Sequence, residues 1–561
     1  MSAIKKKMKL KPAFLLCFAP LCVQALWPIP KSLQTGSGLL KLSSTFDINI
    51  LVTNPPQDLL DAVTRTKGFL KTDKLQRLVV GRGANDSAAL AQAPSLSRLT
   101  LSLAPGSTVR PIATEAAEDV ALRNEVYSLS VPSNGSDATI VASTTLGLFR
   151  GLTTFNQMFY DLQGITYSFE APITIVNDAP VFPYRGFMLD TARHFFPVAD
   201  IKRTLDAMSM VKMSTLHWHA VDSQSFPIEI PGFPELSQKG AYSAEETYST
   251  ADVQDIVKYA GARGIDVMVE LDTPSHASAI SNSHPEHVAC APGSPAVSGE
   301  TRPPGGLRIA TPATQTFAAN FMAAIAKTLP SRLFSTGGDE VNVNCYTKDA
   351  QTQADLKSSG KTLDQAISDF VVMEQKALLA IGKTPVVWEE MAIDHNVALS
   401  NKTIVLVWHS ENIAPVATKG LRFIHAHSDY FYLDCGGGSW LGNRPTLNSW
   451  CDPFKTWQKA YTFDPLANVT TAQKPLIMGG QQLLWTEQSS AENVDSIVWP
   501  RAAVSAEIFW TGATLPTGVA RNVAEALPRL HDVRYRMVQR GIRAIPLQPT
   551  WCALRPHACD D

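Results

Sequence analysis

The sequence predicts an α/β protein in which a (β/α)8 TIM-type barrel follows a small α+β domain. From residue 183 onward, short apolar runs alternate with longer amphipathic segments, as strands and helices do in a closed parallel barrel. Up to about residue 180 the chain is rich in Ser and Thr and has only short strand-like runs. An open doubly wound sheet is the alternative, but no glycine-rich phosphate loop follows a strand.

The composition is that of a globular protein without affinity for polyanions. Hydrophobic residues make up 45% of the 561 residues and charged residues 18%, which excludes a disordered chain. The 49 Lys and Arg against 51 Asp and Glu give a net charge of −2. A nucleic-acid partner is not expected, because such a partner needs a basic surface.

Residues 1–25 have the pattern of a signal peptide. A lysine-rich start precedes an apolar run from Ala13 to Val23, and Val23 and Ala25 occupy the positions of a small-residue cleavage site. A membrane anchor is the alternative, but the run is shorter than the ~20 apolar residues that span a bilayer, and Pro20 interrupts it. We therefore expect a secreted, extracellular protein that does not bind membranes.

The cysteines and glycosylation sequons agree with secretion. Cys17 and Cys22 would leave with the signal peptide, and an even number of cysteines remains, as disulfides in an oxidising compartment require. Pairing in chain order closes the shortest loops and is preferred, although other connectivities stay open. A zinc site is the alternative, but no C-x-x-C pair is present. The cysteines are Cys290, Cys345, Cys435, Cys451, Cys552 and Cys559, and the sequons, which predict a glycoprotein, begin at Asn85, Asn134, Asn401 and Asn468.

The first domain is expected over residues 26–181, and the turn at residues 177–180 marks its end. It combines a helix at 146–160 with short strands at 48–52, 77–80 and 127–131.

The barrel and a C-terminal segment are expected over residues 182–561. Two helices begin with capping-box spacing, Ser249 with Asp252 and Thr362 with Gln365. The eight runs interpreted as strands are residues 185–190, 215–221, 266–272, 333–340, 385–389, 403–408, 430–434 and 476–485.

Catalytic side chains of such barrels lie at the carboxyl ends of the strands. Carboxylates and aromatic residues dominate these ends. A sugar needs both, because its hydroxyls bind acceptors and its apolar ring face packs on flat aromatic side chains. The strand-end residues are Asp190, Asp222, Glu270, Asp272, Asp339, Glu340, Trp388, Glu389, Trp408, Tyr432, Asp434, Trp485 and Glu487.

The sequence Gly337-Gly338-Asp339-Glu340 is the strongest of these signals. Adjacent side chains on a regular strand face opposite ways, so both carboxylates reach one pocket only where the strand ends or bends. The two glycines allow that departure and a close approach of substrate. An N-terminal cap of the next helix is the alternative for an isolated Asp-Glu pair, but the position among the other strand ends favours catalysis.

Two histidines, His217 and His219, alternate along one strand and therefore face the same side. Zinc ligation with Asp222 or His276, structural burial, and a relay in a sugar site are all compatible with this pattern. Because buried structural histidines are more common than metal ligands, we predict neither a metal nor another cofactor.

Several motifs follow one another along nearly the whole chain after the signal peptide. They are LWPIP at 26–30, GLTTF at 151–155, RGFMLDTARH at 185–194, LHWHAVDSQSF at 216–226, ELDTPSH at 270–276, GGDEV at 337–341, GQQLLWTE at 480–487, WPRA at 499–502 and RGI at 540–542. In this order they resemble the family 20 glycoside hydrolases, the β-N-acetylhexosaminidases, and in particular their secreted fungal members. The resemblance implies an exo-acting enzyme that removes terminal N-acetylglucosamine from chito-oligosaccharides or glycans. Tolerance for N-acetylgalactosamine stays open.

The resemblance also implies substrate-assisted retaining hydrolysis through an oxazolinium-type intermediate, in which the 2-acetamido oxygen of the substrate is the nucleophile. Asp339 would orient the acetamido group, Tyr432 would hydrogen-bond its oxygen, and Glu340 would act as general acid and then base. Such an acid needs a raised pKa, which tryptophan walls and a neighbouring carboxylate would supply. The remaining roles implied are a methyl pocket of Trp388, Trp408 and Trp485, hydroxyl binding by Arg185, Asp434 and Glu487, and adjustment of the acid by Asp222, Glu270 and His276.

Two other functions are compatible with such a barrel. A conventional retaining glycosidase would use Glu389 or Glu487 as a nucleophile about 5 Å from Glu340. A non-catalytic carbohydrate-binding protein is the second alternative, which the presence of Asp339, Glu340 and Tyr432 disfavours. The expected partners are an oligosaccharide with a terminal N-acetylhexosamine and, as similar secreted fungal members suggest, a second copy in a homodimer.

Four residues depart from the pattern of animal members. Ser223 replaces an aspartate, Ser275 replaces a glycine, and Gln481-Gln482 replaces a Glu-Ala pair. None of these changes removes a named catalytic role, but they leave leaving-group preference open.

Overall fold

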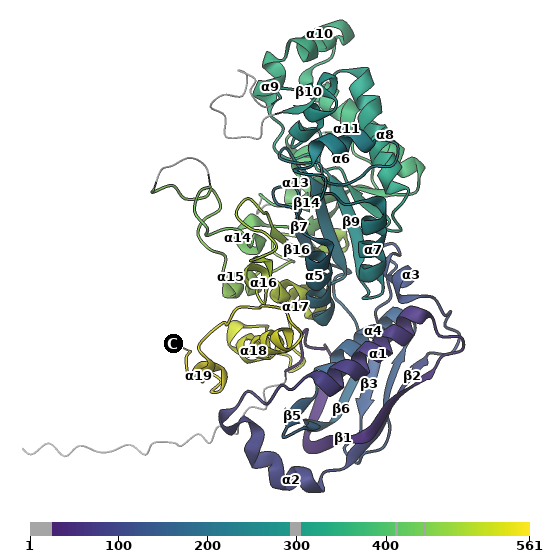
Figure 1. Ribbon diagram of the computed structural model, residues 1–561, viewed down its shortest axis with the longest axis vertical. Helices are drawn as coiled ribbons and strands as arrows, with labels where there is room; N and C mark the ends of the chain where they lie inside the picture. Colours follow the sequence, from purple (N-terminus) through teal and green to yellow (C-terminus); the bar gives the residue numbers. More distant parts are fainter. Residues whose placement is uncertain (1–24, 292–304, 396, 410–412, 441–444, 561) are drawn as a thin grey trace, which may run out of the picture.

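The chain folds into a six-stranded sheet with helices, followed by a closed eight-stranded barrel (Figure 1). This architecture comes from a computed structural model that describes residues 25–560, apart from 292–304, 396, 410–412 and 441–444. The predicted signal peptide, except for Ala25, lies outside the described residues. Within the described ranges, no helix is long and apolar enough to cross a membrane.

The N-terminal sheet is covered by helices on one face. Burial alternates along β3 and β4, because successive strand residues point to opposite faces and only one face packs against α4. The strand order is β1-β2-β4-β3-β6-β5, and β1 also pairs with β6. The elements are β1 (Leu33–Leu51), α1 (Gln57–Thr72), η1 (Val80–Asp86), α2 (Ser87–Gln92), β2 (Ser95–Leu103), α3 (Ile112–Ala116), β3 (Tyr127–Val131), β4 (Ala138–Ala142), α4 (Thr145–Asn156), β5 (Tyr160–Leu162) and β6 (Ile165–Asp178).

One predicted strand of this region is wrong. Residues 77–80 are irregular and lead into η1, where Gly81, Arg82 and Gly83 have φ angles of 78°, 56° and 85°. A strand cannot continue through such left-handed backbone. The strand at 127–131 is confirmed as β3, residues 48–51 belong to the longer β1, and the helix is α4, which ends at Asn156.

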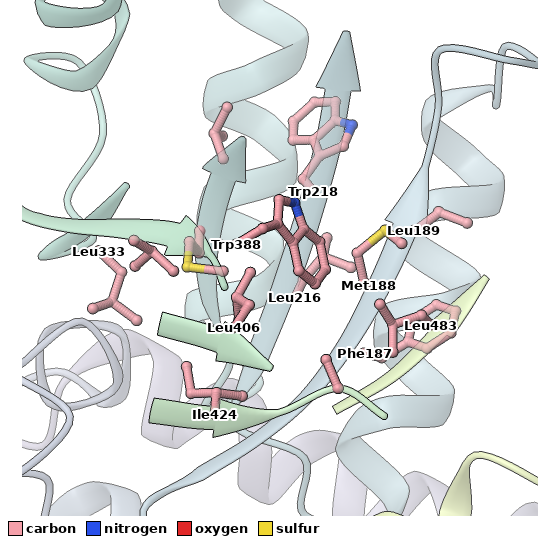
Figure 2. Close-up of a cluster of buried hydrophobic side chains, with 14 of the residues drawn as sticks. Phe187, Met188, Leu189, Leu216, Trp218, Leu333, Trp388, Leu406, Ile424 and Leu483 are labelled. Atoms are coloured by element: carbon pink, nitrogen blue, oxygen red, sulfur yellow. The ribbon is translucent and has the colours of Figure 1, made fainter. Parts of the chain in front are cut away.

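The barrel is parallel throughout, and its strands are almost entirely buried, because side chains point alternately to the interior and to the covering helices. Hydrophobic side chains from seven of these strands form one cluster that includes Trp388 and Met188 (Figure 2). The closed order is β12-β13-β14-β15-β16-β7-β8-β9. The strands are β7 (Tyr184–Asp190), β8 (Thr215–Val221), β9 (Asp266–Leu271), β12 (Leu333–Ser335), β13 (Thr384–Trp388), β14 (Ile404–Val407), β15 (Arg422–His425) and β16 (Ile477–Leu484).

Helices and short elements fill the connections of the barrel. The predicted capping boxes at Ser249 and Thr362 are confirmed at the starts of α7 and α11. The elements are α5 (Val198–Met210), α6 (Pro234–Gly240), α7 (Thr250–Gly261), η2 (Ser278–Asn282), η3 (Pro285–His287), β10 (Val288–Ala289), β11 (Gly306–Leu307), α8 (Pro312–Ala326), α9 (Val343–Lys348), α10 (Ala350–Ser359), α11 (Leu363–Ala380), α12 (Glu390–Ile393), α13 (Ala414–Thr418), α14 (Ser428–Phe431), α15 (Trp457–Tyr461), η5 (Lys474–Leu476), α16 (Val494–Val498), α17 (Ala503–Thr511), α18 (Val523–Gln539) and α19 (Thr550–Ala553).

The seventh strand was predicted at the wrong place. The strand is β15, whereas residues 430–434 form the end of α14 and the loop after it. The apolar character of that run comes from an aromatic cluster, since Phe431 is fully buried against Phe463 and Phe509. The other seven runs correspond to barrel strands, although the run at 333–340 pairs only as far as Ser335.

The three disulfides follow chain order, as predicted. They join Cys290 to Cys345, Cys435 to Cys451, and Cys552 to Cys559. The sequon residues Asn85, Asn134, Asn401 and Asn468 are all exposed. Their glycosylation stays a prediction.

The prediction that Arg185 binds substrate is wrong. Arg185 lies at the start of β7, at the junction with the N-terminal domain, and its side chain is fully buried. Its Nη2 donates to both carboxylate oxygens of Glu125 at 2.7 and 2.6 Å, and its Nε donates to the Lys212 carbonyl. Glu125 also accepts from Arg150 of α4. Burial lowers the pKa of Arg185 to about 10 despite Glu125, so this arginine belongs to a buried ion network between the domains.

We therefore expect Arg185→Met to reduce stability rather than substrate affinity. Removing one partner leaves the Glu125 charge partly uncompensated in the interior, which costs about 3–5 kcal/mol. The surface pair of Arg98 and Asp137 offers a matched control, because its side chains are 56% and 49% exposed and Arg98→Met should cost less than about 1 kcal/mol. Thermal unfolding checks both variants. An unchanged melting temperature with a raised KM for Arg185→Met would contradict this account.

Candidate active site

A cavity of about 340 Å³ opens at the carboxyl ends of the barrel strands. It is lined by eight of the residues that the sequence analysis predicted for the site, and these follow five different barrel strands. The predicted residues that line it are His276, Asp339, Glu340, Trp408, Tyr432, Asp434, Trp485 and Glu487. Arg193, Trp440 and Trp450 line it as well, and the sequence prediction did not place them there.

The loop after β12 brings both central carboxylates into this cavity. Gly337 and Gly338 have φ angles of 67° and 106°, and Glu340 also has a positive φ of 50°. A Cβ on Gly337 would overlap the carboxyl group of Asp272, and a Cβ on Gly338 would contact Met391. The loop therefore needs both glycines, as predicted. It leaves the side chain of Asp339 10% exposed and that of Glu340 39% exposed.

Asp339 lies against a second buried carboxyl group, that of Asp272. The side chains of Asp272 and Asp339 are hydrogen-bonded to each other, and Asp272 Oδ1 also accepts from the backbone N–H of Gly338 at 2.9 Å. Burial and the charge of Asp339 raise the pKa of Asp272 well above its ordinary value. Burial also raises the pKa of Asp339, but the positive His276 and the hydrogen bond from Asp272 oppose this shift. Of the two acids, Asp272 is therefore the more readily protonated and Asp339 the more readily ionised.

His276 connects the catalytic carboxylates to a buried acid behind them. Its Nδ1 lies 3.0 Å from Asp222 Oδ2, and its Nε2 lies 3.6 Å from Asp339 and 3.5 Å from Glu340. Burial disfavours a charged imidazole, but the carboxylates of Asp222 and Asp339 outweigh it and raise the pKa of His276 well above its ordinary value. A positive His276 thus holds both carboxylates in place.

Both histidines of β8 contact buried carboxylates. Both face Glu270, as the strand alternation predicts: His217 Nε2 lies 3.1 Å from Glu270, and His219 Nδ1 is hydrogen-bonded to it. The other nitrogen of His219 contacts Asp222 at 3.1 Å. Burial lowers the pKa of His219, but these two hydrogen bonds raise it to about 9. At neutral pH His219 is therefore positive and donates to both carboxylates.

Aromatic rings form one wall of the cavity. The ring of Trp408 is stacked on Tyr432 and meets Trp450 edge-on, and its indole N–H donates to Glu390 at 3.0 Å. Burial raises the pKa of Tyr432 well above its ordinary value, so its hydroxyl stays a hydrogen-bond donor. Trp485 lies 6.3 Å from Tyr432, measured between ring centroids.

The structure places Trp388 behind this wall. Its side chain is 1% exposed and packs between His217 and Trp485, with ring centroids 6.0 and 6.2 Å away. Figure 2 shows it among Leu216, Leu406 and Met188. Trp388 therefore supports the floor under Trp485 and does not belong to the cavity lining.

Arg193, and not Arg185, is the arginine that lines the cavity. Its guanidinium contacts Asp190 at 3.1 Å and Asp222 at 2.8 Å, lies 4.0 Å from Glu487, and packs over the ring of Trp485 at 5.1 Å. Arg193 follows the end of β7 by three residues, so it reaches the cavity from the loop. In the sequence, Arg193 is marked only by its position inside the motif at 185–194.

Two further acids stand beside Arg193 and the aromatic wall. Burial and the charge of Glu487 raise the pKa of Asp434 to about 8, and burial raises the pKa of Glu487. Asp434 accepts a hydrogen bond from the backbone N–H of Trp485 at 3.4 Å. Acceptors and donors thus face a space in which sugar hydroxyls need both.

Comparison with known proteins agrees with this geometry. Residues 182–513 match the model of "Glycosyl hydrolase family 20, catalytic domain". The chain belongs to glycosyl hydrolase family 20. Residues 26–158 match a second model, "beta-acetyl hexosaminidase like", which precedes the catalytic domain. The resemblance read from the motifs is therefore confirmed, and the protein is a glycoside hydrolase of this family.

Relatives from several kingdoms cover most of this family 20 chain. It is 34% identical to a β-hexosaminidase of Arthroderma benhamiae, over 78% of this chain and 74% of that protein. It is 31% identical to a chitooligosaccharidolytic β-N-acetylglucosaminidase of Bombyx mori, over 95% and 89%. Among solved structures, the chitobiase of Flavobacterium johnsoniae matches with a TM-score of 0.72 and 26% identity, covering 92% of this chain and 73% of that one.

We expect Arg193→Gln to weaken substrate binding. A hydrogen bond to a charged group is worth about 1.5–3 kcal/mol, so the loss should raise KM about 10- to 100-fold with a smaller change in kcat. Steady-state kinetics on an aryl N-acetylglucosaminide checks this, with Arg263→Gln, remote from the cavity, as the matched control. A KM within twofold of the wild-type value would contradict the placement of Arg193.

Proposed function

We propose that this protein is an exo-acting β-N-acetylhexosaminidase that removes terminal N-acetylglucosamine, and to some extent N-acetylgalactosamine, by substrate-assisted retaining hydrolysis. The observation that carries this proposal is the unequal exposure of two adjacent carboxylates, with the side chain of Asp339 10% exposed and that of Glu340 39% exposed. The exposed acid suits proton exchange with a leaving group that departs into solvent and with water that enters from it. The buried acid suits a group that the substrate inserts.

In the first step, the acetamido oxygen of the substrate attacks its own anomeric carbon while the glycosidic C–O bond breaks. Glu340 donates its proton to the leaving oxygen. The acetamido nitrogen becomes positive, and ionised Asp339 accepts its N–H and stabilises the charge. Neutral Tyr432 donates to the acetamido oxygen, and Trp408 and Trp485 pack around the methyl group.

In the second step, Glu340, now a carboxylate, takes a proton from water as the water oxygen attacks the anomeric carbon. The oxazolinium ring opens and the acetamido group is restored, with net retention of configuration. Asp272 holds its proton throughout, since transfer to Asp339 would remove the negative charge that the intermediate needs. His276 keeps the two carboxylates oriented during both steps.

The shape of the cavity supports exo action. A volume of about 340 Å³ accommodates about one sugar residue with its acetamido group. Arg193 and its partners Asp190 and Asp222 close the deep side, while Trp440 and Trp450, 53% and 66% exposed, stand at the rim. The chain to be trimmed would leave past this rim.

The alternative nucleophiles fit less well. Glu389 is 4% exposed, accepts the backbone N–H of His409 at 2.6 Å, and does not belong to the cavity lining. Glu487 faces Arg193, as a residue that binds hydroxyls would.

Digestion of reducing-end-labelled chitotriose tests the exo and retaining proposals together. The expected first products are unlabelled N-acetylglucosamine, released as the β-anomer by proton NMR, and labelled chitobiose. Labelled N-acetylglucosamine among the first products would contradict exo action. An α-anomer would contradict retention.

The proposal also includes secretion, glycosylation, a boundary between the two domains at residues 181 and 182, and a homodimer. The three disulfides and the exposed sequon asparagines support export to an oxidising, glycosylating compartment. Size-exclusion chromatography with light scattering, before and after glycosidase treatment, tests glycosylation and the homodimer. An unchanged mass after treatment would contradict glycosylation, and a monomer mass would contradict the dimer.

A further inference from the structure

A second cavity, of about 300 Å³, lies where the barrel adjoins the N-terminal domain. Helices α1 and α4 of the N-terminal domain and α5 and α18 of the barrel part surround it, and these helices meet at this junction in Figure 1. None of its lining residues lines the active site. A cavity of this size suits a small molecule rather than a single water.

The charge of this cavity is positive and incompletely neutralised. Four arginines line it, and three of them pair with aspartates: Arg263 with Asp206, Arg536 with Asp532, and Arg540 with Asp73. The fourth, Arg65, donates to the Ala262 carbonyl at 2.8 Å and has no carboxylate within 4.0 Å among the described residues. Burial and the charge of Arg263 lower the pKa of Arg65, and the more distant charges of Asp61 and Asp206 offset this shift only in part. An anion beside Arg65 would offset the repulsion between the charges of Arg65 and Arg263.

A buried acceptor faces the same cavity. Asn156, the last residue of α4, is 7% exposed, and its Oδ1 has no hydrogen-bond donor among the described residues. An unpaired buried acceptor costs about 1–3 kcal/mol, so a donor from a ligand would stabilise it. Apolar surface completes the lining, with Phe149 and Met210 on the two sides of the domain junction.

We propose that this inter-domain cavity binds a small hydroxylated organic anion of the size of a sugar acid. Its acidic group pairs with Arg65, a hydroxyl donates to Asn156 Oδ1, and its carbon skeleton packs on the apolar lining. Because the cavity is formed by both domains, the bound anion stabilises their junction. This site is independent of the hydrolytic activity proposed above.

Isothermal titration and thermal unfolding with D-glucuronate test the proposal, with D-glucose as the uncharged control of similar size. We expect one glucuronate per chain and a melting temperature that rises with its concentration, whereas glucose has no effect. Arg65→Gln should weaken glucuronate binding at least about tenfold, the effect of losing 1.4 kcal/mol. Lys71→Gln removes a charge from the same helix, outside the cavity, and should leave binding unchanged.

A second variant tests the proposal in case Arg65→Gln does not fold. Asn156→Leu replaces an unpaired buried acceptor with an apolar group, so it should fold and still lose the response to glucuronate. Saturating N-acetylglucosamine should leave glucuronate binding unchanged, because it would fill only the active site. No binding of glucuronate at millimolar concentration, equal binding of glucose, or displacement by N-acetylglucosamine would each overturn the proposal.

Discussion

Asp339→Asn should lower kcat/KM about 10³-fold while leaving the fold intact. Loss of one preorganised electrostatic group costs about 10²–10³ in rate, and here the lost group is the full charge opposite the cationic intermediate. The amide is isosteric, and it can still hydrogen-bond to the buried carboxyl of Asp272. The measurement is steady-state hydrolysis of an aryl N-acetylglucosaminide, together with thermal unfolding.

The matched control for this variant is Asp429→Asn. The side chain of Asp429 is 61% exposed and pairs with Lys455, outside the cavity. Its activity should stay within twofold of the wild-type value. Wild-type-like turnover by Asp339→Asn would remove the stabilising role from Asp339 and with it the proposed mechanism.

Glu340→Gln should show an effect that depends on the leaving group. General acid catalysis contributes about 10²–10⁴, so hydrolysis of chitobiose should fall by roughly that factor. A nitrophenolate leaves without a proton, so the first step on a nitrophenyl substrate should be much less affected, and breakdown of the intermediate should become rate-limiting. Rates over a series of phenol leaving groups measure this difference.

Azide provides the second arm of this experiment. Azide attacks the anomeric carbon without a general base, so it should accelerate the Glu340→Gln variant and yield a β-glycosyl azide. The wild-type enzyme should gain little. Equal losses for good and poor leaving groups, without an effect of azide, would contradict the assignment of Glu340 as acid and base.

The sequence could predict those site residues that lie close to a correctly assigned strand. Trp485 directly follows β16, and Glu487, Asp339 and Glu340 lie three to five residues beyond their strands, so the shared edge of a barrel brings them together. Tyr432 and Asp434 were also identified, but through the motif resemblance and a misplaced strand, because β15 ends seven residues before Tyr432.

The residues that were misassigned depend on where a side chain points in three dimensions. Arg185 begins β7 and turns toward Glu125, away from the site, whereas Arg193 reaches the site from a loop. Trp450 is brought to the rim by the loop that the disulfide Cys435–Cys451 closes. The raised pKa of Asp272 follows from its burial next to Asp339, and no linear pattern in the sequence indicates that these two carboxyl groups meet.

The central claim is that the substrate supplies its own nucleophile. Its most direct test compares hydrolysis of an aryl N-acetyl-β-glucosaminide with that of the matching aryl β-glucoside, which lacks the acetamido group. This account predicts fast cleavage of the first and almost none of the second. Comparable cleavage of both would contradict it and point to a carboxylate of the protein as nucleophile.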